Sequence, residues 1–147
     1  MSAEPMEFLI NTAEQHDLFG EFLPPAYGAE AARRWAGTPE WAESADRVLD
    51  YALTEWQEIR AEQEEIENRL IVLLTDGRPA DGPEAMDAAE AHRRHIDRWF
   101  HACPPERHRR IAAFVVADAS FHARYEGLAR GLARYVHGAV VANASRS

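Results

Sequence analysis

The sequence contains one cysteine, no lysine and no long apolar run, and each shortage excludes a class of protein. Cys103 has no partner for a disulfide within the chain, which suits a reducing compartment. No apolar stretch reaches the ~18–20 residues that a membrane-spanning helix requires. We also find no basic start followed by an apolar core, as a secretion signal would have. We therefore expect a cytoplasmic protein that does not act in a membrane.

Positive charge is scarce as well. Sixteen basic residues, all of them arginine, stand against 25 acidic residues, so the formal net charge is −9 at pH 7. A protein that binds nucleic acid needs a basic face for the phosphates, and an anionic membrane surface attracts the same kind of face. The composition therefore argues against direct binding to nucleic acid or to a membrane.

The composition that remains is that of one globular domain. A chain of 147 residues with 46% hydrophobic and 28% charged residues can bury a real core. We find no alternating strand pattern, no internal repeat and no low-complexity tract. We therefore predict an all-α fold, with six to eight helices in a single domain that spans residues 1–147.

The clearest predicted helix begins at Pro83 and ends before Pro104. Proline fits the first turn of a helix, where its missing N–H would be unpaired in any case, and it cannot continue the hydrogen-bond ladder further on. Apolar residues recur in this segment at helical spacing: Met86, Ala89, Ile96, Trp99, Phe100 and Cys103. His92 lies four residues before Ile96, so we place its imidazole on the apolar face.

Helix starts and breaks divide the rest of the chain. Thr54 and Gln57 match a capping box, so we favour a helix that restarts at Glu55 over one long helix. Its glutamates are predicted to form a solvated face: Glu55, Glu58, Glu62, Glu64, Glu65 and Glu67. Asp118 or Ser120 could cap a later helix. The other predicted helices cover residues 6–19, 29–36, 39 to about 53, 105–117, 121–127 and 131–144.

Seven histidines raise the question of a metal site. His92 and His95 are three residues apart, and His101 and His108 flank Cys103. Neither group supplies the four ligands of a structural zinc site, and the metal-binding spacings H-E-x-x-H and Glu-x-x-His are absent. A haem held by His92 would have no other support in the sequence. We therefore expect no metal and no cofactor.

Three interpretations remain for the residues that carry chemistry. Cys103 and His108 could form a nucleophile and base of a small enzyme, although no phosphate-binding loop or G-x-S-x-G motif accompanies them. His92 could simply be a core histidine that bonds a hydroxyl or a carbonyl. The aromatic side chains could be ordinary core or could line a cleft for a small molecule. A helical protein-interaction module is a further alternative.

Short motifs also follow one another in a fixed order along nearly the whole chain. They are Phe19-Gly20-x-Phe22 with Tyr27, Arg34-Trp35, Glu55-Trp56-Gln57-x-Ile59, Gly77-x-Pro79-Ala80, Ala85-Met86-Asp87-Ala88-Ala89-Glu90-x-His92-Arg93-x-x-Ile96, Cys103, Val116-x-Asp118-x-x-Phe121, Gly131-Leu132-Ala133-x-Tyr135 and Ala142-Asn143-Ala144. This ordered set resembles the antibiotic-recognition domain of the TipA-type regulators of the MerR family.

The resemblance implies a compact, globin-like bundle without haem, with a deep cleft for bulky hydrophobic antibiotics such as thiopeptides. It implies that residues 1–37 form a mobile lid over the ligand. In the regulators a DNA-binding winged helix and a coiled coil precede this domain, and we expect no DNA-binding domain in this chain. The expected function is to bind and sequester such an antibiotic, either for drug resistance or for sensing the ligand.

The resemblance also implies which residues bind the ligand: Phe19, Phe22, Tyr27, Trp35, His92, Arg93, His95, Ile96, Trp99, Cys103 and Phe114. Aromatic side chains give flat contact area at a low cost in entropy, and Arg93 and His95 could bond amides or a carboxylate. The family cysteine that captures thiopeptides covalently aligns with Arg110, so covalent capture is not expected. Val115 stands where the family often has tyrosine, which would change the shape of the pocket.

Overall fold

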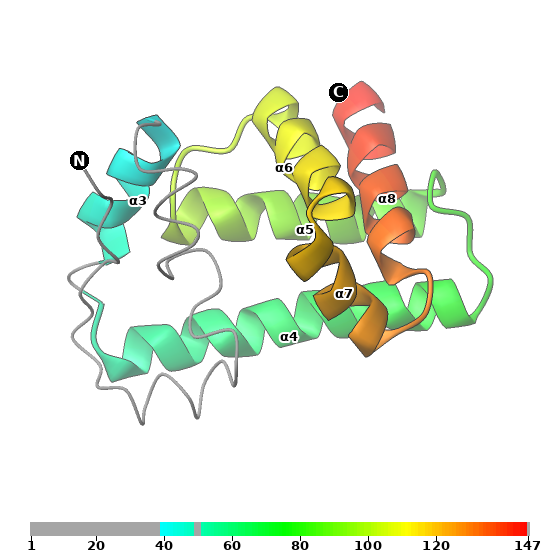
Figure 1. Cartoon of the computed structure of the whole chain (residues 1–147), viewed down its shortest axis with the longest axis horizontal. Helices are drawn as coiled ribbons and strands as arrows, with labels where there is room; N and C mark the ends of the chain where they lie inside the picture. Colours follow the sequence, from blue (N-terminus) through cyan, green and yellow to red (C-terminus); the bar gives the residue numbers. More distant parts are fainter. Residues whose placement is uncertain (1–38, 49–50, 147) are drawn as a thin grey trace. The chain divides into compact units, whose positions relative to one another are not determined.

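The computed structural model describes residues 39–48 and 51–146, and every regular element within these ranges is an α-helix (Figure 1). The helices are α3 (Pro39–Val48), α4 (Leu53–Thr75), α5 (Pro83–Trp99), α6 (Pro105–Ala117), α7 (Ala119–Leu128) and α8 (Leu132–Arg146). The predicted all-α fold is confirmed. The predicted helices over 6–19 and 29–36, and the predicted lid over 1–37, lie outside the described residues. None of the described helices is both long and apolar enough to cross a membrane.

The described residues belong to two compact units, each with its own core. The first unit contains residues 39–48, 51–62 and 98–102, and the second contains residues 63–97 and 103–146. Helices α4 and α5 each contribute to both units, because the boundaries fall within them.

Two tryptophans and two aliphatic side chains form the core among the described residues of the first unit. Trp56 and Ile59 from α4 pack with Val48 and Trp99, and all four side chains are buried. Tyr51 meets the rings of Trp56 and Trp99 edge-on, with centroids 5.7 and 5.6 Å away. Its hydroxyl donates a hydrogen bond to the Trp99 carbonyl at 2.6 Å. Trp56 and Ile59 therefore lie on the buried side of α4.

The start of α4 confirms the predicted helix restart but not its boundary. The helix begins at Leu53, and the Glu55 carboxylate at its third position accepts a hydrogen bond from the backbone N–H of Ala52 at 3.1 Å. This is the reciprocal half of a capping box. The Thr54 hydroxyl donates to Glu55 instead of capping the helix. The predicted cap was wrong by two positions because Glu55, not Gln57, makes the bond back to the cap residue.

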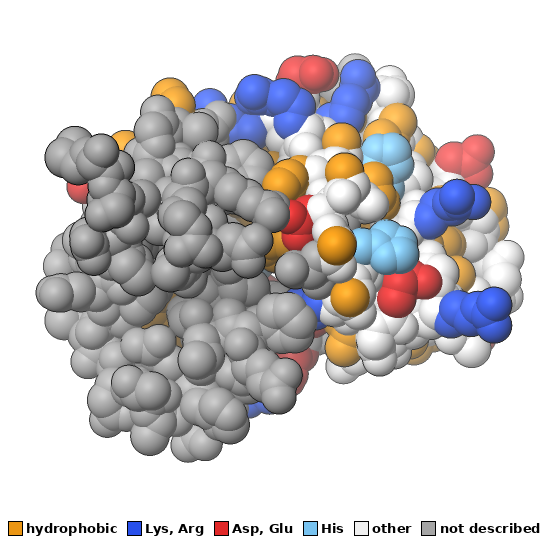
Figure 2. All heavy atoms as spheres, viewed as in Figure 1, with side chains coloured by type: hydrophobic (Ala, Val, Ile, Leu, Met, Phe, Trp, Pro, Cys, Tyr) orange, Lys and Arg blue, Asp and Glu red, His pale blue; other side chains and the backbone are white. Residues whose placement is uncertain are grey.

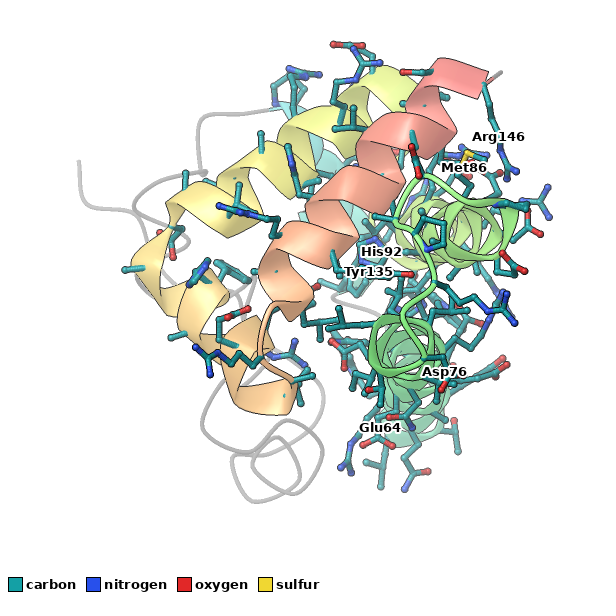
Figure 3. The ribbon with its side chains drawn as sticks, turned by 90° about the vertical axis from the view of Figure 1, so that its right-hand side faces the viewer. Glu64, Asp76, Met86, His92, Tyr135 and Arg146 are labelled. Atoms are coloured by element: carbon teal, nitrogen blue, oxygen red, sulfur yellow. The ribbon has the colours of Figure 1, made fainter. Side chains whose placement is uncertain are left out.

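The core of the second unit is built largely from alanines and aliphatic side chains. Helices α6 and α8 run side by side, and α7 contacts both of them (Figure 1). Small side chains allow helices to approach closely, and the buried core contains Ala85, Ala88, Ala89, Ala112, Ala133 and Ala139 together with Ile66, Leu70, Leu132, Val136 and Val140. Arg146 at the end of α8 lies beside the first turns of α5, near Met86 (Figure 3), and bonds Asp87 at 3.0 Å.

The end of α5 differs from the prediction. The helix ends at Trp99, although the sequence placed Cys103 on its apolar stripe. After Trp99, side chains and not further helical turns bond the backbone groups. The Asp97 carboxylate accepts a hydrogen bond from the Cys103 N–H at 2.9 Å, and Arg93 donates to the Cys103 carbonyl at 2.9 Å. Cys103 therefore lies in a fixed turn and not on the helical stripe where the sequence placed it.

Acidic side chains also cap the N-termini of α7 and α8. Asp118 ends α6, and its carboxylate accepts a hydrogen bond from the Phe121 N–H at 3.1 Å, so it caps α7 as one of the two predicted candidates. Glu126 accepts hydrogen bonds from the N–H groups of Gly131 and Ala133 at the start of α8, at 2.9 and 3.2 Å. A carboxylate satisfies helix N–H groups and interacts favourably with the helix dipole.

Two glycines near the turn between α7 and α8 are expected to change the stability in opposite directions when replaced by alanine. Gly131 has φ of +87°, so Gly131→Ala is expected to cost about 1 kcal/mol of stability through backbone strain. Gly127 lies exposed in α7 with open space around it, so Gly127→Ala is expected to add about 0.5 kcal/mol. Urea denaturation followed by circular dichroism measures both values. Equal effects of the two substitutions would contradict the assigned backbone conformation.

The coloured surface of Figure 2 mixes basic, acidic, histidine and apolar side chains. Among the described residues, Val72 and Leu128 are the large apolar side chains that stand exposed. Such scattered apolar residues are normal on a protein surface.

Candidate functional site

Two helices of the second unit bring His92 and His108 into contact. His92 points from α5 toward the other helices of the unit (Figure 3), and its Nδ1 lies 2.8 Å from Nε2 of His108 on α6. The ring centroids are 5.0 Å apart and the planes are tilted by 39°. His108 is 1% exposed, whereas His92 is only partly buried. The sequence had placed the two residues in separate hypotheses, and no local pattern pairs them.

Both imidazoles are held in the neutral form at pH 7. Burial lowers the pKa of His108 to about 4, and the nearby Arg93 guanidinium acts in the same direction. Burial also lowers the pKa of His92 well below its ordinary value, with further repulsion from His108, His95 and Arg124. A neutral pair can form one hydrogen bond, because one ring presents an N–H and the other a bare nitrogen.

Glu90 connects α5 to α8 and to the turn that holds Cys103. Its carboxylate accepts hydrogen bonds from Arg93 Nε at 2.8 Å, Arg94 Nε at 3.1 Å and Asn143 Nδ2 at 3.0 Å. The bonds from Arg93, reinforced by Asn143, lower the pKa of Glu90 to about 2. Arg93 in turn donates to the Cys103 carbonyl. Glu90 therefore fixes the position of Arg93, a role that sequence reasoning missed.

Glu67 and Arg124 form a buried ion pair, which corrects the prediction that Glu67 lies on a solvated face. Glu67 is 8% exposed, and its two oxygens accept hydrogen bonds from Arg124 at 2.8 and 3.3 Å. The parallel geometry of the two bonds suits the guanidinium fork. The neighbouring Tyr125 is buried, and burial raises the pKa of its hydroxyl to about 12. This pair ties α4 to α7 inside the second unit.

The predicted ligand-binding residues fall into three groups. Phe19, Phe22, Tyr27 and Trp35 lie outside the described residues. Trp99 belongs to the first unit, where Tyr51 bonds its carbonyl. The second unit contains His92, Arg93, His95, Ile96, Cys103 and Phe114.

Within the second unit these side chains differ in how far they reach the surface. His95, Ile96 and Cys103 are buried, and the Arg93 guanidinium is engaged by Glu90. Phe114 is only partly buried and meets Phe121 edge-on at 5.6 Å. Contact between any of these residues and a ligand stays a prediction.

The chemistry of Cys103 does not favour the enzyme alternative. The side chain is 0% exposed, and burial raises the pKa of the thiol to about 12. A cysteine nucleophile needs an accessible group with a lowered pKa. The Nε2 atom of His108, moreover, faces His92. Within the described ranges, no three His, Cys, Asp or Glu side chains are grouped so that they could hold a metal ion.

Comparison with known sequences finds relatives of the chain among bacterial transcriptional regulators. The family described as the TipAS antibiotic-recognition domain matches residues 27–143. The HTH-type transcriptional activators TipA of Streptomyces coelicolor and Streptomyces lividans are each 35% identical over 146 residues, 99% of this chain. The chain spans 58% of their length. The HTH-type transcriptional regulator SkgA of Caulobacter vibrioides is 29% identical over 115 residues, which cover 78% of this chain and 43% of that protein.

Solved structures agree with these relatives. TipAS of Streptomyces lividans, solved in complex with nosiheptide as part of a thiopeptide antibiotic multidrug resistance system, has a TM-score of 0.87 and 34% identity. The match covers 95% of this chain and 98% of that one. The antibiotic-binding domain of a TipA-class multidrug resistance transcriptional regulator has a TM-score of 0.57 and 40% identity, covering 62% of this chain and 97% of that one. The chain therefore belongs to the TipAS antibiotic-recognition domain family.

Proposed function

We propose that this chain binds a bulky hydrophobic antibiotic of the thiopeptide class and acts by sequestering it. The observation that carries the proposal is the likeness, along nearly the full length of both chains, to TipAS solved with nosiheptide bound. Identity at this level over so much of the chain supports a shared kind of ligand as well as a shared fold.

The side chains of the second unit are compatible with such a ligand. His92 and Phe114 are both partly exposed and offer an uncharged imidazole and an aromatic ring. Binding sites for large apolar ligands combine aromatic walls with a few polar groups that fix orientation. The formal charge of −9 disfavours direct contact with DNA, so we assign this chain the ligand and no nucleic acid.

Binding is expected to be noncovalent. The position that aligns with the capturing cysteine of the family holds Arg110, which is exposed on α6. The one thiol, Cys103, is buried and has a pKa raised to about 12 by its burial. Intact-mass measurement after incubation with thiostrepton is therefore expected to show unmodified protein. A mass increase equal to the antibiotic would contradict this expectation.

Nosiheptide is expected to quench the tryptophan fluorescence saturably and to raise the melting temperature. A ligand that binds only the folded form at one hundred times its Kd adds about 2.7 kcal/mol of stability. The His92→Ala variant is expected to bind roughly tenfold more weakly, as loss of one good polar contact would cause. His122→Ala, at an exposed position of α7, serves as the control and should bind like the wild type. No quenching and no thermal shift with nosiheptide, thiostrepton or a wider panel of hydrophobic antibiotics would overturn the proposal.

A further inference from the structure

We infer that His108 is a positioning residue that holds His92 in one tautomer, so that His92 offers the ligand a ring nitrogen with a single hydrogen-bonding role. The inference rests on the proposed function, because it assigns His92 to the ligand site. It adds a residue that does not itself touch the ligand and a reason why the site would discriminate between ligand groups.

The contact between the two rings couples their tautomers. His92 Nδ1 and His108 Nε2 are 2.8 Å apart, which is the length of a full hydrogen bond. Two N–H groups or two bare nitrogens cannot share such a bond, and each neutral ring has one of each. If His92 Nδ1 donates, its Nε2 is bare and can only accept. If Nδ1 accepts, Nε2 carries the proton and can only donate.

The burial of His108 decides that one arrangement persists. A solvated imidazole exchanges tautomers readily because water can accept or supply the proton at either nitrogen. His108 is 1% exposed, so water has little access to move the proton from one of its nitrogens to the other. Because the two rings share a hydrogen bond, the protonation of His108 Nε2 determines that of His92 Nδ1 on the other helix. The tautomer of a histidine is commonly set in this way by the bond that its second nitrogen makes.

Burial of the pair disfavours the imidazolium form, which would present N–H groups at both nitrogens, and most of the surrounding charged groups act in the same direction. Arg93 and Glu90 on α5 lie near His108, where Arg93 acts against its protonation and Glu90 favours it. His95 on α5 and Arg124 on α7 act against protonation of His92. The pKa values of both rings are lowered in consequence, with burial as the larger cause. Near neutral pH the ligand therefore meets one neutral tautomer and not a mixture.

Histidine nitrogen shifts in ¹⁵N-labelled protein without ligand test the inference. Long-range ¹H–¹⁵N spectra distinguish a protonated from a bare ring nitrogen, and the signals of His92 are identified by their loss in His92→Gln. The wild type is expected to show one protonated and one bare nitrogen for His92, unchanged between pH 6 and pH 8. In His108→Phe, which removes the partner, the two nitrogens are expected to move toward a common averaged shift.

His108→Gln provides a second variant that keeps a polar group in the buried position. Its amide can turn to donate or accept, so the hydrogen bond survives while the choice of tautomer is lost, and His92 is expected to average here too. His122→Gln, at an exposed site, should leave the His92 signals unchanged. Averaged shifts in the wild type, or a fixed tautomer in both His108 variants, would overturn the inference.

Binding measurements separate this inference from the proposed function. His108→Gln is expected to bind nosiheptide about twofold more weakly than the wild type, because about half of the population then presents the wrong group to the ligand. Fixed His92 shifts in a wild type that binds no antibiotic would refute the proposed function and leave the coupling of the two rings standing. Wild-type affinity in a variant whose His92 shifts are averaged would refute the positioning role and leave the proposed function standing.

Discussion

Glu67→Ala is expected to destabilise the protein by about 3–5 kcal/mol, which is the usual cost of removing one partner of a buried ion pair. The substitution leaves the Arg124 guanidinium without its bidentate carboxylate in a position where its side chain is only 18% exposed. Water cannot fully replace the lost bonds there. Urea denaturation followed by circular dichroism gives the change in free energy of unfolding.

The double variant Glu67→Leu with Arg124→Met separates the cost of removing only the carboxylate from the contribution of the ion pair. Replacing both partners by apolar side chains of similar size is often nearly neutral or stabilising, so we expect the double variant to lie within about 1 kcal/mol of the wild type. Glu106→Ala is the matched control, because Glu106 is largely exposed and meets Arg109 at 3.6 Å. It should change stability by less than about 1 kcal/mol. A similarly small effect of Glu67→Ala would show that Glu67 is solvated after all.

The case of Glu67 shows what the sequence could not provide. Along α4, the glutamates look alike to a pattern that counts apolar residues at helical spacing. Whether one of them is buried depends on Arg124, which lies 57 residues later and arrives from α7. Tertiary partners of this kind leave no trace in the local sequence. The contact between His92 and His108 was missed for the same reason, although each side chain had been noticed separately.

Local signals performed better, and their errors have a common cause. Pro83 and Pro105 mark the first residues of their helices as predicted, because proline acts through its own backbone. The boundaries that failed were decided by acidic side chains. Glu55 accepts the N–H of Ala52, so α4 begins before the predicted cap residue. Asp97 accepts the N–H of Cys103 and holds the turn in which Cys103 lies. Several residues compete for such backbone groups, and the sequence does not show which one reaches them.

The candidate site was predicted from the resemblance to the TipA-type family and not from residue chemistry alone. The residues by themselves left a cleft, a core histidine and a Cys/His enzyme as alternatives. The structure adds that Arg93 is engaged by Glu90 and that the Cys103 thiol is buried. It also identifies His108, which the sequence had offered as the base in the enzyme alternative, as the partner of His92.

Acid is expected to destabilise the protein well above the pH range in which carboxylates titrate. His108 has a pKa of about 4 in the fold against an ordinary value of 6.5, so below pH 6.5 the unfolded chain binds a proton that the folded chain refuses. Stability therefore falls as the pH drops from 6.5 to 4, by about 3 kcal/mol for this ring alone. His92 changes in the same direction, and because the rings are in contact the two titrate as a coupled pair.

Glu90 adds a second loss at lower pH. Its pKa is about 2 in the fold against an ordinary value of 4.5, so the stability contributed by the ionised carboxylate is complete above pH 4.5 and disappears as the pH falls toward 2. The sign is the same as for the histidines, because in both cases the unfolded chain binds protons more readily. The free energy of unfolding should therefore decrease continuously from pH 6.5 downward.

Two variants show which group causes each part of the dependence of stability on pH. His108→Gln is expected to reduce the decline between pH 6.5 and pH 4 to the part that His92 contributes, because a neutral amide does not titrate, whereas Glu90→Gln should reduce it only below pH 4.5. His122→Gln, whose side chain is exposed, should reproduce the wild-type profile. The measurement is urea denaturation at half-unit steps of pH. If the free energy of unfolding of the wild type stays constant down to pH 4.5, protons reach the His92–His108 pair freely. The assignment of a neutral histidine pair in the second unit would then be wrong.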